Sequence, residues 1–369
     1  MRLRELGGLA MNILALITDG FGGDGGIARY NRDLLAALSA SGDVHKVVAI
    51  PRHSPGASEP LPPKVIQTQA IGGRRAYAMA ALRTARQEGA FDVIFCGHLY
   101  MAPLAALLST SLRMRLWLQL HGIEAWRAPG TLVRRSIAGA SLVTSVSRFT
   151  RHRFLAWADV PRETVRVLPN TFDAAFTPGE RPQGLARRLD VEGRKVILTV
   201  SRLDERERYK GHDRVLAALA RALASHPDAV FVIVGDGGDR QRLADMAQEL
   251  GLAAHVRFVG HVPGDELADY YRLADLFVMP STGEGFGIVF LEAAAAGLPV
   301  IGGNCDGSVD ALADGAIGTV VNPLRIEEIA EAIVAGLGRG RMTAPGALAR
   351  FSRSNFAAHV SALVKPLAA

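Results

Sequence analysis

Residues 11–31 read MNILALITDGFGGDGGIARYN and contain an apolar run, a glycine-rich loop and the start of an amphipathic segment. The apolar run, residues 11–16, has the length and composition of a buried strand. In the segment that follows, residues 27–40, apolar side chains recur at helical spacing. A strand joined to a helix by a loop is the repeating unit of parallel α/β sheets, so this stretch predicts the fold class.

The same alternation continues along the chain. The strand candidates are residues 13–18, 46–50, 93–96, 115–120, 142–146 and 165–168 in the first half, and 196–200, 231–234, 256–259, 276–279 and 299–301 in the second. Amphipathic helices separate them, which is typical of parallel sheets with right-handed crossovers. We therefore predict an α/β protein with two tandem Rossmann-like, doubly wound domains. Ligands are expected at the carboxyl ends of the strands, in the cleft between the domains.

Turn-forming residues without periodicity mark the division between the domains. The stretch NTFDAAFTPGERPQG, residues 170–184, is such a segment. It predicts an N-terminal domain over 11–172, a linker over 173–194 and a C-terminal domain over 195–350. Residues 351–369 are expected to form a helix that packs back across the domains. Residues 1–10 precede a second methionine at the start of a strand, and we interpret them as an extension.

The positive charge is concentrated in the first half of the chain. Residues 1–180 carry 21 Lys and Arg against 13 Asp and Glu, whereas residues 181–369 carry 21 against 23. Such a surface suits an anionic partner, either a phosphorylated ligand or acidic lipid headgroups. A solvated arginine-rich surface is the alternative interpretation. The chain has no basic motif interleaved with aromatic residues, which disfavours nucleic acid as a partner.

Cysteine usage and hydropathy indicate the compartment. Cys96 and Cys305 lie far apart in apolar surroundings, which disfavours a disulfide framework or a zinc site and fits a reducing environment. No apolar run approaches the roughly 18–20 residues of a transmembrane helix, and residues 1–10 lack the apolar core of a signal peptide. We expect a cytoplasmic protein, and the basic first half makes the inner face of the cytoplasmic membrane a candidate location.

The glycine-rich loop raises the question of a nucleotide cofactor. Gly20, Gly22 and Gly25 have the G-x-G-x-x-G spacing of dinucleotide-binding folds. Those folds also carry an acidic residue at the end of the second strand, and HKVVAIPRH, residues 45–53, has none. This disfavours a dehydrogenase. The loop still exposes backbone N–H groups to an anion, and a flexible turn is the alternative.

A pair of glutamates gives the most informative motif of the second half. The stretch MPSTGEGFGIVFLEAAAAGLPVIG, residues 279–302, places Glu284 in a glycine-rich loop and Glu292 in the helix that follows. One carboxylate accepts two hydrogen bonds at once, so each glutamate is suited to hold a vicinal diol. One diol on a sugar and one on a ribose, with a diphosphate between them, describe a sugar nucleotide.

With this E-x7-E pair, the sequence resembles the family-4 glycosyltransferases, retaining enzymes of the GT-B fold, over nearly the whole chain. The resemblance implies that Glu284 contacts the hydroxyls of the donor sugar and that Glu292 binds the nucleotide ribose. It also implies that the backbone amides of Gly285, Phe286 and Gly287 meet the sugar and the phosphates. Members of the family commonly have a glutamate where this chain has Asp310, and the shorter side chain leaves that supporting contact in doubt.

A second motif, VSRLDERERYKGHDRVLAAL at residues 200–219, resembles the segment that neutralises the donor diphosphate in the family. The resemblance assigns this role to Arg202 and Lys210. Fixed cations stabilise the negative charge that develops on a leaving diphosphate. Arg206 and Arg208 are alternative phosphate ligands. In the alternative interpretation of Lys210, this residue only caps an exposed helix start and binds no phosphate. The chain has no Asp-x-Asp pair, which favours a mechanism without a metal or another cofactor.

Two histidines follow strands of the first half. In LWLQLHGIEAW, residues 116–126, His121 stands where the family places a histidine near the reacting centre. A structural histidine is the alternative. His98, in FCGHLY after another strand, is expected on the same edge of the sheet, where it is a candidate for binding the acceptor.

The resemblance completes the expected donor site with two further segments. Gly235 and Asp236, together with the backbone near Val262, are implied near the nucleobase, although Asp236 is also a candidate cap for the helix near residue 239. The glycine-rich loop of the first half is implied under the donor phosphates and beside the acceptor. Its candidate residues are Gly22, Gly23, Gly25 and Gly26.

We therefore expect a hexose to pass from a nucleoside-diphosphate sugar to an acceptor hydroxyl with retention of configuration. The resemblance implies a front-face substitution. Mannose is favoured over a glucose-type sugar, and GDP and UDP both stay open. The expected acceptor is a lipid-linked or oligosaccharide intermediate of bacterial exopolysaccharide, lipopolysaccharide or glycolipid assembly. An inactive nucleotide-sugar-binding subunit of a polysaccharide assembly complex is the alternative; a GT-B epimerase or phosphorylase is disfavoured.

Overall fold

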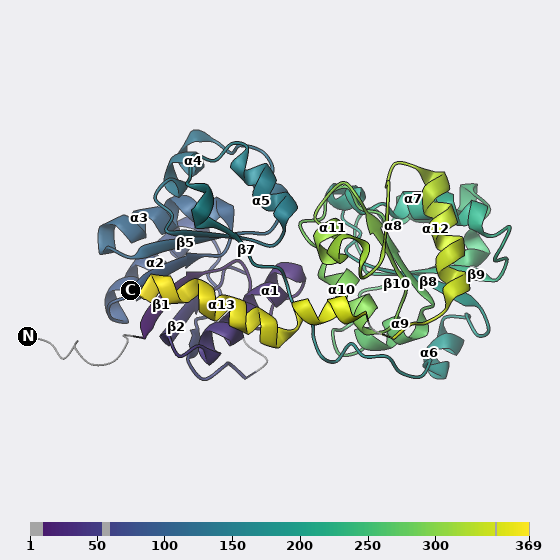
Figure 1. Cartoon of the computed structure of the whole chain (residues 1–369), viewed down its shortest axis with the longest axis horizontal. Coiled ribbons are helices and arrows are strands. Elements are labelled where there is room, and N and C mark those ends of the chain that lie inside the picture. Colours follow the sequence, from purple (N-terminus) through teal and green to yellow (C-terminus); the bar gives the residue numbers. More distant parts are fainter. Residues whose placement is uncertain (1–9, 54–59, 344, 369) are drawn as a thin grey trace, which may run out of the picture. The chain divides into compact units, whose positions relative to one another are not determined.

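The computed structural model describes residues 10–53, 60–343 and 345–368 and divides into two compact units (Figure 1). Unit 1 runs to Thr171 and includes the C-terminal segment from Ser352, and unit 2 spans Phe172–Phe351. Residues 1–9 of the predicted extension lie outside the described residues.

Unit 1 is built on a seven-stranded parallel sheet with strand order β3-β2-β1-β4-β5-β6-β7. The strands are β1 (Met11–Leu16), β2 (Val44–Ile50), β3 (Val65–Gln67), β4 (Val93–Cys96), β5 (Arg115–Leu120), β6 (Leu142–Ser145) and β7 (Val165–Val167). β3 was not predicted from the sequence, because three residues after a proline pair give no periodic signal. The order reverses between β1 and β4, and ligands of doubly wound sheets bind at the carboxyl ends of strands at such a reversal.

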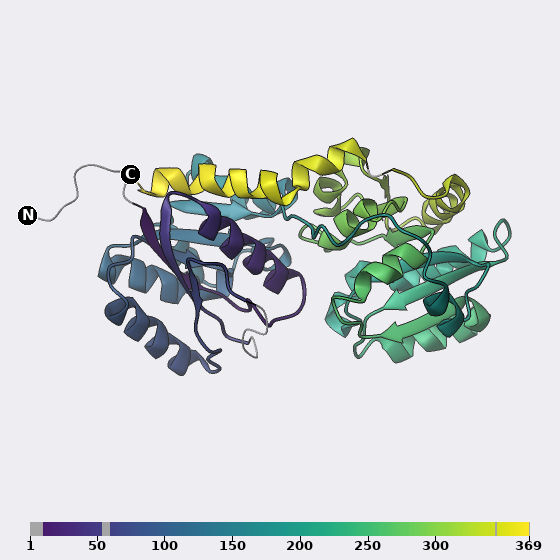
Figure 2. The same cartoon turned by 90° about the horizontal axis from the view of Figure 1, so that it is seen from below.

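Helices cover both faces of this sheet. They are α1 (Gly26–Ala40), α2 (Arg74–Gln87), α3 (Ala102–Leu112), α4 (Thr131–Ile137), α5 (Arg148–Leu155) and α13 (Arg353–Ala368). Figures 1 and 2 show α13, in yellow, beside α1, and these two helices are in contact. The predicted C-terminal helix therefore packs against the first helix of unit 1.

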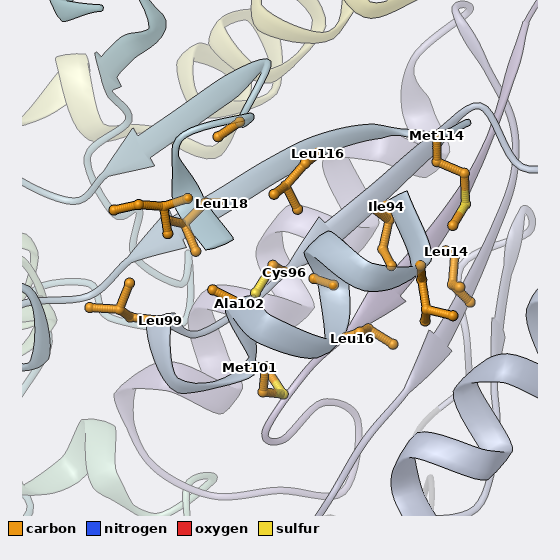
Figure 3. Close-up of a cluster of buried hydrophobic side chains, with 14 of the residues drawn as sticks. Leu14, Leu16, Ile94, Cys96, Leu99, Met101, Ala102, Met114, Leu116 and Leu118 are labelled. Carbon is orange, nitrogen blue, oxygen red and sulfur yellow. The ribbon is translucent and has the colours of Figure 1, made fainter. Parts of the chain in front are cut away.

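Alternate residues of β1, β4 and β5 form one of the unit's cores, shown in Figure 3. Leu14, Ile94 and Leu116 point to the same face of the sheet because side chains alternate along a strand. Met101 and Ala102, at the start of α3, pack against them. These strands are buried on both faces, so they read as continuous apolar runs in the sequence.

Unit 2 repeats the plan with a six-stranded sheet of order β10-β9-β8-β11-β12-β13. Its strands are β8 (Lys195–Val200), β9 (Ala229–Val234), β10 (Val256–Gly260), β11 (Leu276–Met279), β12 (Val300–Gly303) and β13 (Thr319–Val321). Its helices are α6 (Gln183–Arg188), α7 (His212–Ala222), α8 (Arg240–Glu249), α9 (Leu267–Leu273), α10 (Ile288–Ala295), α11 (Ser308–Ala311) and α12 (Ile326–Arg339). The reversal between β8 and β11 places another ligand crevice at their carboxyl ends.

The prediction of two doubly wound parallel-sheet domains is confirmed. One local difference lies in the predicted linker, where residues 183–188 form α6. Leu185 and Ala186 are buried there, but two apolar residues among turn formers give no recognisable period. No helix in the described part of the chain combines the length and apolar character needed to cross a membrane.

Candidate active site

The charged residues singled out in the second half lie at one edge of the unit 2 sheet. Arg202 follows β8, Asp236 follows β9, and Glu284 follows β11. Parallel strands bring their carboxyl ends to the same edge, so residues more than 80 positions apart become neighbours. The same edge also receives Asp306 after β12, a residue that sequence reasoning did not select.

Backbone hydrogen bonds fix the loop that carries Glu284. The N–H of Glu284 donates to Oδ2 of Asp306 at 2.6 Å, and the carbonyl of Glu284 accepts from the N–H of Gly307 at 2.8 Å. At the start of the loop, the N–H of Gly283 donates to Oγ of Ser281 at 3.0 Å. Glu284 is therefore held from both sides by the turn after β12, and its own carboxylate is left for other partners.

Asp306 is the buried carboxylate on which this arrangement depends. It is 1 % exposed, and its second oxygen, Oδ1, accepts the N–H of Ser308 at 2.9 Å. Burial raises the pKa of this carboxyl above its usual value. The sequence had pointed instead to Asp310, on α11, as the supporting acid. The available signal was an Asp-Gly turn placed directly after a strand, which is an ordinary turn pattern in most contexts.

Arg202 and Lys210 meet at one carboxylate. Glu207 pairs with the guanidinium of Arg202, and its Oε2 lies 2.8 Å from Nζ of Lys210. The side chain of Lys210 is 11 % exposed, which does not fit a solvated lysine at a helix start. Arg202 is 74 % exposed. Of the alternative phosphate ligands, Arg208 pairs with Asp239 at 2.7 Å.

The loop with Lys210 is joined to the loop with Glu284. The carbonyl of Tyr209 accepts the N–H of Thr282 at 2.9 Å, and the ring of Tyr209 packs against Gly283. The charged groups that act on the Glu284 carboxyl reflect this proximity. Burial raises the pKa of the Glu284 carboxyl. The nearby cations Lys210 and Arg202 lower this pKa, whereas the carboxylates of Asp306 and Glu207 raise it. The structure thus brings Arg202, Lys210 and Glu284 into one electrostatic cluster.

Glu292 lies on α10 in a different environment. It is 1 % exposed, and its Oε2 accepts a hydrogen bond of 2.7 Å from the hydroxyl of Tyr271. Phe286 is also buried, and Gly287 directly precedes the helix with φ of 87°. A ribose diol bound by Glu292 must share the carboxylate with Tyr271 or displace its hydroxyl. Gly285 completes the backbone at the mouth of the helix.

The predicted nucleobase segment borders the same edge. Gly235 has φ of 128°, and a Cβ there would lie 1.8 Å from the carbonyl oxygen of Ser201, so only glycine allows β8 and β9 to stay this close. Asp236 is exposed, and its Oδ1 accepts the N–H of Gly237 at 2.9 Å. Asp236 does not cap α8, which begins four residues later. Val262 is half-buried in the coil after β10.

In unit 1, the two histidines follow the neighbouring strands β4 and β5. Nε2 of His121 lies 2.9 Å from the carbonyl oxygen of Gly97. Because a carbonyl only accepts, Nε2 carries the proton and Nδ1 is an acceptor. Burial lowers the pKa of His121 to about 4. Nδ1 of His98 accepts the N–H of Tyr100 at 3.4 Å, and the two imidazole centroids are 6.1 Å apart.

A buried polar network supports the strand that ends at His121. The hydroxyl of Tyr30, on α1, donates to Oε1 of Gln119 at 2.6 Å. The hydroxyl of Thr144, on β6, donates to the same oxygen at 2.6 Å and accepts Nε1–H of Trp117 at 2.7 Å. The edge of the Tyr30 ring also lies against the His121 imidazole, with centroids 5.2 Å apart. Satisfied networks of this kind fix side chains in one position.

The glycine-rich loop is anchored at its start and open at its end. Gln67, on β3, holds the backbone N–H and carbonyl of Phe21, each at 2.9 Å. A Cβ at Gly20 would lie 2.4 Å from the Gln67 side chain. A side chain at Gly20 would therefore have to displace the Gln67 amide from its hydrogen bonds to Phe21. Around Gly25 and Gly26, at the start of α1, the described residues leave open space. Gly22 and Gly23 lie between these two regions.

The chemical capacity of the two edges differs. Unit 2 offers two cations, a carboxylate for hydroxyl groups and glycine-lined backbone, which suits a sugar diphosphate. Unit 1 offers two neutral imidazoles beside a glycine loop, which suits uncharged hydroxyl groups and an anion near the start of α1. Among the described residues, no group of three or more His, Cys, Asp and Glu side chains is placed to hold a metal ion.

Comparison with known proteins agrees with this chemistry. Residues 185–337 match the family model of the glycosyl transferases group 1, and residues 24–176 match that of glycosyltransferase family 4. A GDP-mannose-dependent alpha-(1-6)-phosphatidylinositol monomannoside mannosyltransferase of Mycolicibacterium smegmatis is 35 % identical over 69 % of this chain and 69 % of its own length. A D-inositol 3-phosphate glycosyltransferase of Acidothermus cellulolyticus is 27 % identical over 95 % of this chain and 85 % of its own.

Solved structures share the fold. HepE of Anabaena, in complex with UDP and glucose, aligns with a TM-score of 0.76 at 23 % identity and covers 96 % of this chain and 100 % of its own. WaaG, a glycosyltransferase involved in lipopolysaccharide biosynthesis, aligns with a TM-score of 0.64 at 20 % identity, covering 95 % of each chain.

Proposed function

Because the chain belongs to the family-4 glycosyltransferases and is a hexosyltransferase, we propose that it transfers mannose from GDP-mannose to an acceptor hydroxyl, with retention of configuration and without a metal. The observation that carries the proposal is the cluster of Arg202, Lys210 and Glu284 at one edge of unit 2. Two cations beside a half-buried carboxylate match a diphosphate beside sugar hydroxyls.

The choice of mannose and guanine rests on the relatives. The Mycolicibacterium smegmatis protein, at 35 % identity, uses GDP-mannose by name. The solved HepE structure contains UDP and glucose, but at 23 % identity that likeness supports the fold alone. UDP-glucose is therefore the natural competitor in an assay.

In the proposed reaction, the bond between the anomeric carbon and the diphosphate oxygen breaks while a bond to the acceptor oxygen forms. The acceptor proton passes to the leaving diphosphate. Arg202 and Lys210 stabilise the charge that this group gains, and Glu284 holds the sugar hydroxyls in position. His121, with its pKa lowered to about 4, stays neutral and offers Nδ1 as an acceptor to a sugar hydroxyl.

We also propose that unit 1 binds the acceptor and that the protein works at the inner face of the cytoplasmic membrane. α4 combines Leu132, which is 70 % exposed, with the exposed Arg134 and Arg135. Leu107, on the adjacent α3, is 63 % exposed. Exposed apolar side chains among arginines suit a surface of anionic lipids. The acceptor class that this favours is a lipid-linked sugar or a glycolipid.

The test is transfer of label from GDP-mannose to extracted bacterial membrane lipids by the purified protein in the presence of EDTA. UDP-glucose, in parallel, decides the donor, and NMR of the product decides the anomeric configuration. A lipid product with retained configuration from GDP-mannose supports the proposal. Labelled product from UDP-glucose alone would overturn the assignment of GDP-mannose as the donor. Donor binding without transfer would favour an inactive nucleotide-sugar-binding subunit.

A further inference from the structure

Arg52 occupies a fixed position at the ligand edge of unit 1. It lies two residues after β2, and the N–H groups of Arg52 and His53 both donate to the carbonyl of Thr18, at 2.9 and 3.0 Å. Thr18 follows β1 and leads into the glycine-rich loop. The backbone of Arg52 is thus tied to the crevice at the carboxyl ends of β1 and β4.

The guanidinium of Arg52 is held by aromatic rings. Its Cζ lies 5.5 Å from the ring centroid of Tyr77 and 5.5 Å from that of Tyr100. The hydroxyl of Tyr77 donates to the carbonyl of Ile50 at 2.7 Å, so the ring of Tyr77 is fixed. Tyr100 is 44 % exposed and packs against His98, with centroids 4.5 Å apart.

Within the described part of the chain, the charge of this guanidinium is not balanced by an acidic side chain. Nε of Arg52 is buried and has no hydrogen-bond acceptor among the described residues, and no acidic side chain there forms an ion pair with Arg52. A buried N–H of a charged group without an acceptor is costly, and buried charges in proteins are normally paired. The aromatic rings orient the guanidinium and the hydroxyl of Tyr100 interacts with it, but neither tyrosine supplies a negative charge.

We propose that Arg52 binds a phosphate group of the acceptor. The planar guanidinium presents N–H donors in a fork that matches phosphate, and its aromatic cradle keeps the fork in one orientation. Successive side-chain contacts link Arg52, Tyr100, His98 and His121 along the ends of β2, β4 and β5, so a phosphate bound at Arg52 would lie at the same sheet edge as the imidazoles. The inference rests on the proposed function, which supplies the acceptor, and it adds the acceptor's chemical class.

The donor diphosphate is a less suitable partner for Arg52. Unit 2 already provides Arg202 and Lys210 for that charge. Replacement of Arg52 should therefore leave nucleotide binding unchanged, which separates this inference from the proposed function.

The experiment measures binding of glycerol 1-phosphate and glycerol to the full chain by calorimetry, and binding to vesicles of phosphatidylglycerol or phosphatidylcholine by sedimentation. Arg52→Gln removes the charge, and Arg52→Lys keeps the charge without the fork. Arg75→Gln is the matched control, because Arg75 is exposed on α2 and its loss changes the net charge of unit 1 equally. GDP binding is measured with each variant.

We expect wild-type protein to prefer either glycerol 1-phosphate over glycerol or anionic phosphatidylglycerol over zwitterionic phosphatidylcholine, and Arg52→Gln to weaken that binding at least about 10-fold, as loss of a charge-assisted hydrogen bond does. Arg52→Lys should be intermediate, and Arg75→Gln and GDP binding should be unchanged. If binding of glycerol 1-phosphate depends on Arg52, the acceptor phosphate is that of a free phosphate ester. If only binding to vesicles depends on Arg52, the phosphate is that of a lipid headgroup. The inference would be overturned by equal binding of wild type and Arg52→Gln, by an equal loss in Arg75→Gln, or by the absence of a preference for the anionic probe in both pairs. Absence of GDP binding in the wild type would instead count against the proposed function.

Discussion

Nζ of Lys210 lies 2.8 Å from Oε2 of Glu207, and the same carboxylate pairs with the guanidinium of Arg202. The two cations assigned to the donor diphosphate therefore share a protein carboxylate in this structure. Glu207 is 13 % exposed, so this pairing is less screened by solvent than one on an open surface. In the proposed function, a bound diphosphate would compete with Glu207 for both cations.

We predict that Glu207→Gln binds nucleoside diphosphate more tightly than the wild type, because the competing charge is gone. An increase of about 10-fold in affinity, equivalent to about 1.4 kcal/mol, is expected. Calorimetric titration with GDP measures it. Glu205→Gln is the control, because Glu205 is exposed on the same short helix, and it should change little. Unchanged or weaker binding by Glu207→Gln would show that Glu207 positions the cations instead of competing for them.

Glu284→Ala and Lys210→Ala should each lower turnover at least about 100-fold, as the loss of one contact to a developing charge does. The initial rate of transfer, measured on protein with an unchanged unfolding midpoint, tests this prediction. Lys195→Ala, at the opposite end of β8, is the control for the lost charge. Near-normal rates in either site variant would refute its assignment.

Asp306→Asn should perturb Glu284 without touching the donor. The carboxylate accepts the N–H groups of Glu284 and Ser308 on separate oxygens, and an amide has only one acceptor oxygen. We expect a loss of about 1–3 kcal/mol in stability and a lower turnover, with a larger effect for Asp306→Ala. Asp228→Asn, at the other end of β9, removes the same charge as a control. Wild-type turnover in Asp306→Ala would contradict the positioning role.

His212 should make the protein less stable in mild acid. His212 is 4 % exposed, and its Nε2 lies 2.7 Å from Oγ of Ser201. Burial lowers the pKa of His212 to about 4. The positive charges of Lys210 and Arg242 also lower this pKa, and the Asp239 carboxylate raises it. Between pH 6.5 and 4 the unfolded chain binds the proton more readily, so the stability gained from neutral His212 is lost as the pH falls. Thermal unfolding of the wild type and His212→Gln at pH 7 and pH 5 tests this. The advantage of the wild type should shrink at pH 5, and an unchanged difference would exclude the titration of His212.

The fold was predictable because its signals are local. β1 is an apolar run, and the helix after the glycine-rich loop has apolar residues at helical spacing. The repetition of this strand and helix pattern along the chain predicts both sheets. β3 and β13 were missed because each is three residues long, follows turn-forming residues and takes its pairing from a longer neighbour. α6 was missed because the neighbours that bury Leu185 and Ala186 are not visible in the local sequence.

The site was less predictable, because its decisive contacts join distant loops. The positions of Arg202, Lys210 and Glu284 followed from motifs and strand ends. The role of Glu207 depends on the turn of its short helix, and that of Asp306 depends on a hydrogen bond across 22 residues to the Glu284 loop. Arg52 gave no motif at all, since its aromatic neighbours Tyr77 and Tyr100 come from separate elements.

The measurement closest to the central claim is thermal unfolding of the purified protein against GDP, UDP, ADP and their sugar conjugates in EDTA. A ligand at about 100 times its dissociation constant adds roughly 2.7 kcal/mol to the stability of the state that binds it. We expect GDP and GDP-mannose to raise the unfolding midpoint of the wild type, and Lys210→Ala to lose most of this shift. No shift with any nucleotide, or an equal shift in Lys210→Ala, would contradict a metal-free diphosphate site at the edge of unit 2.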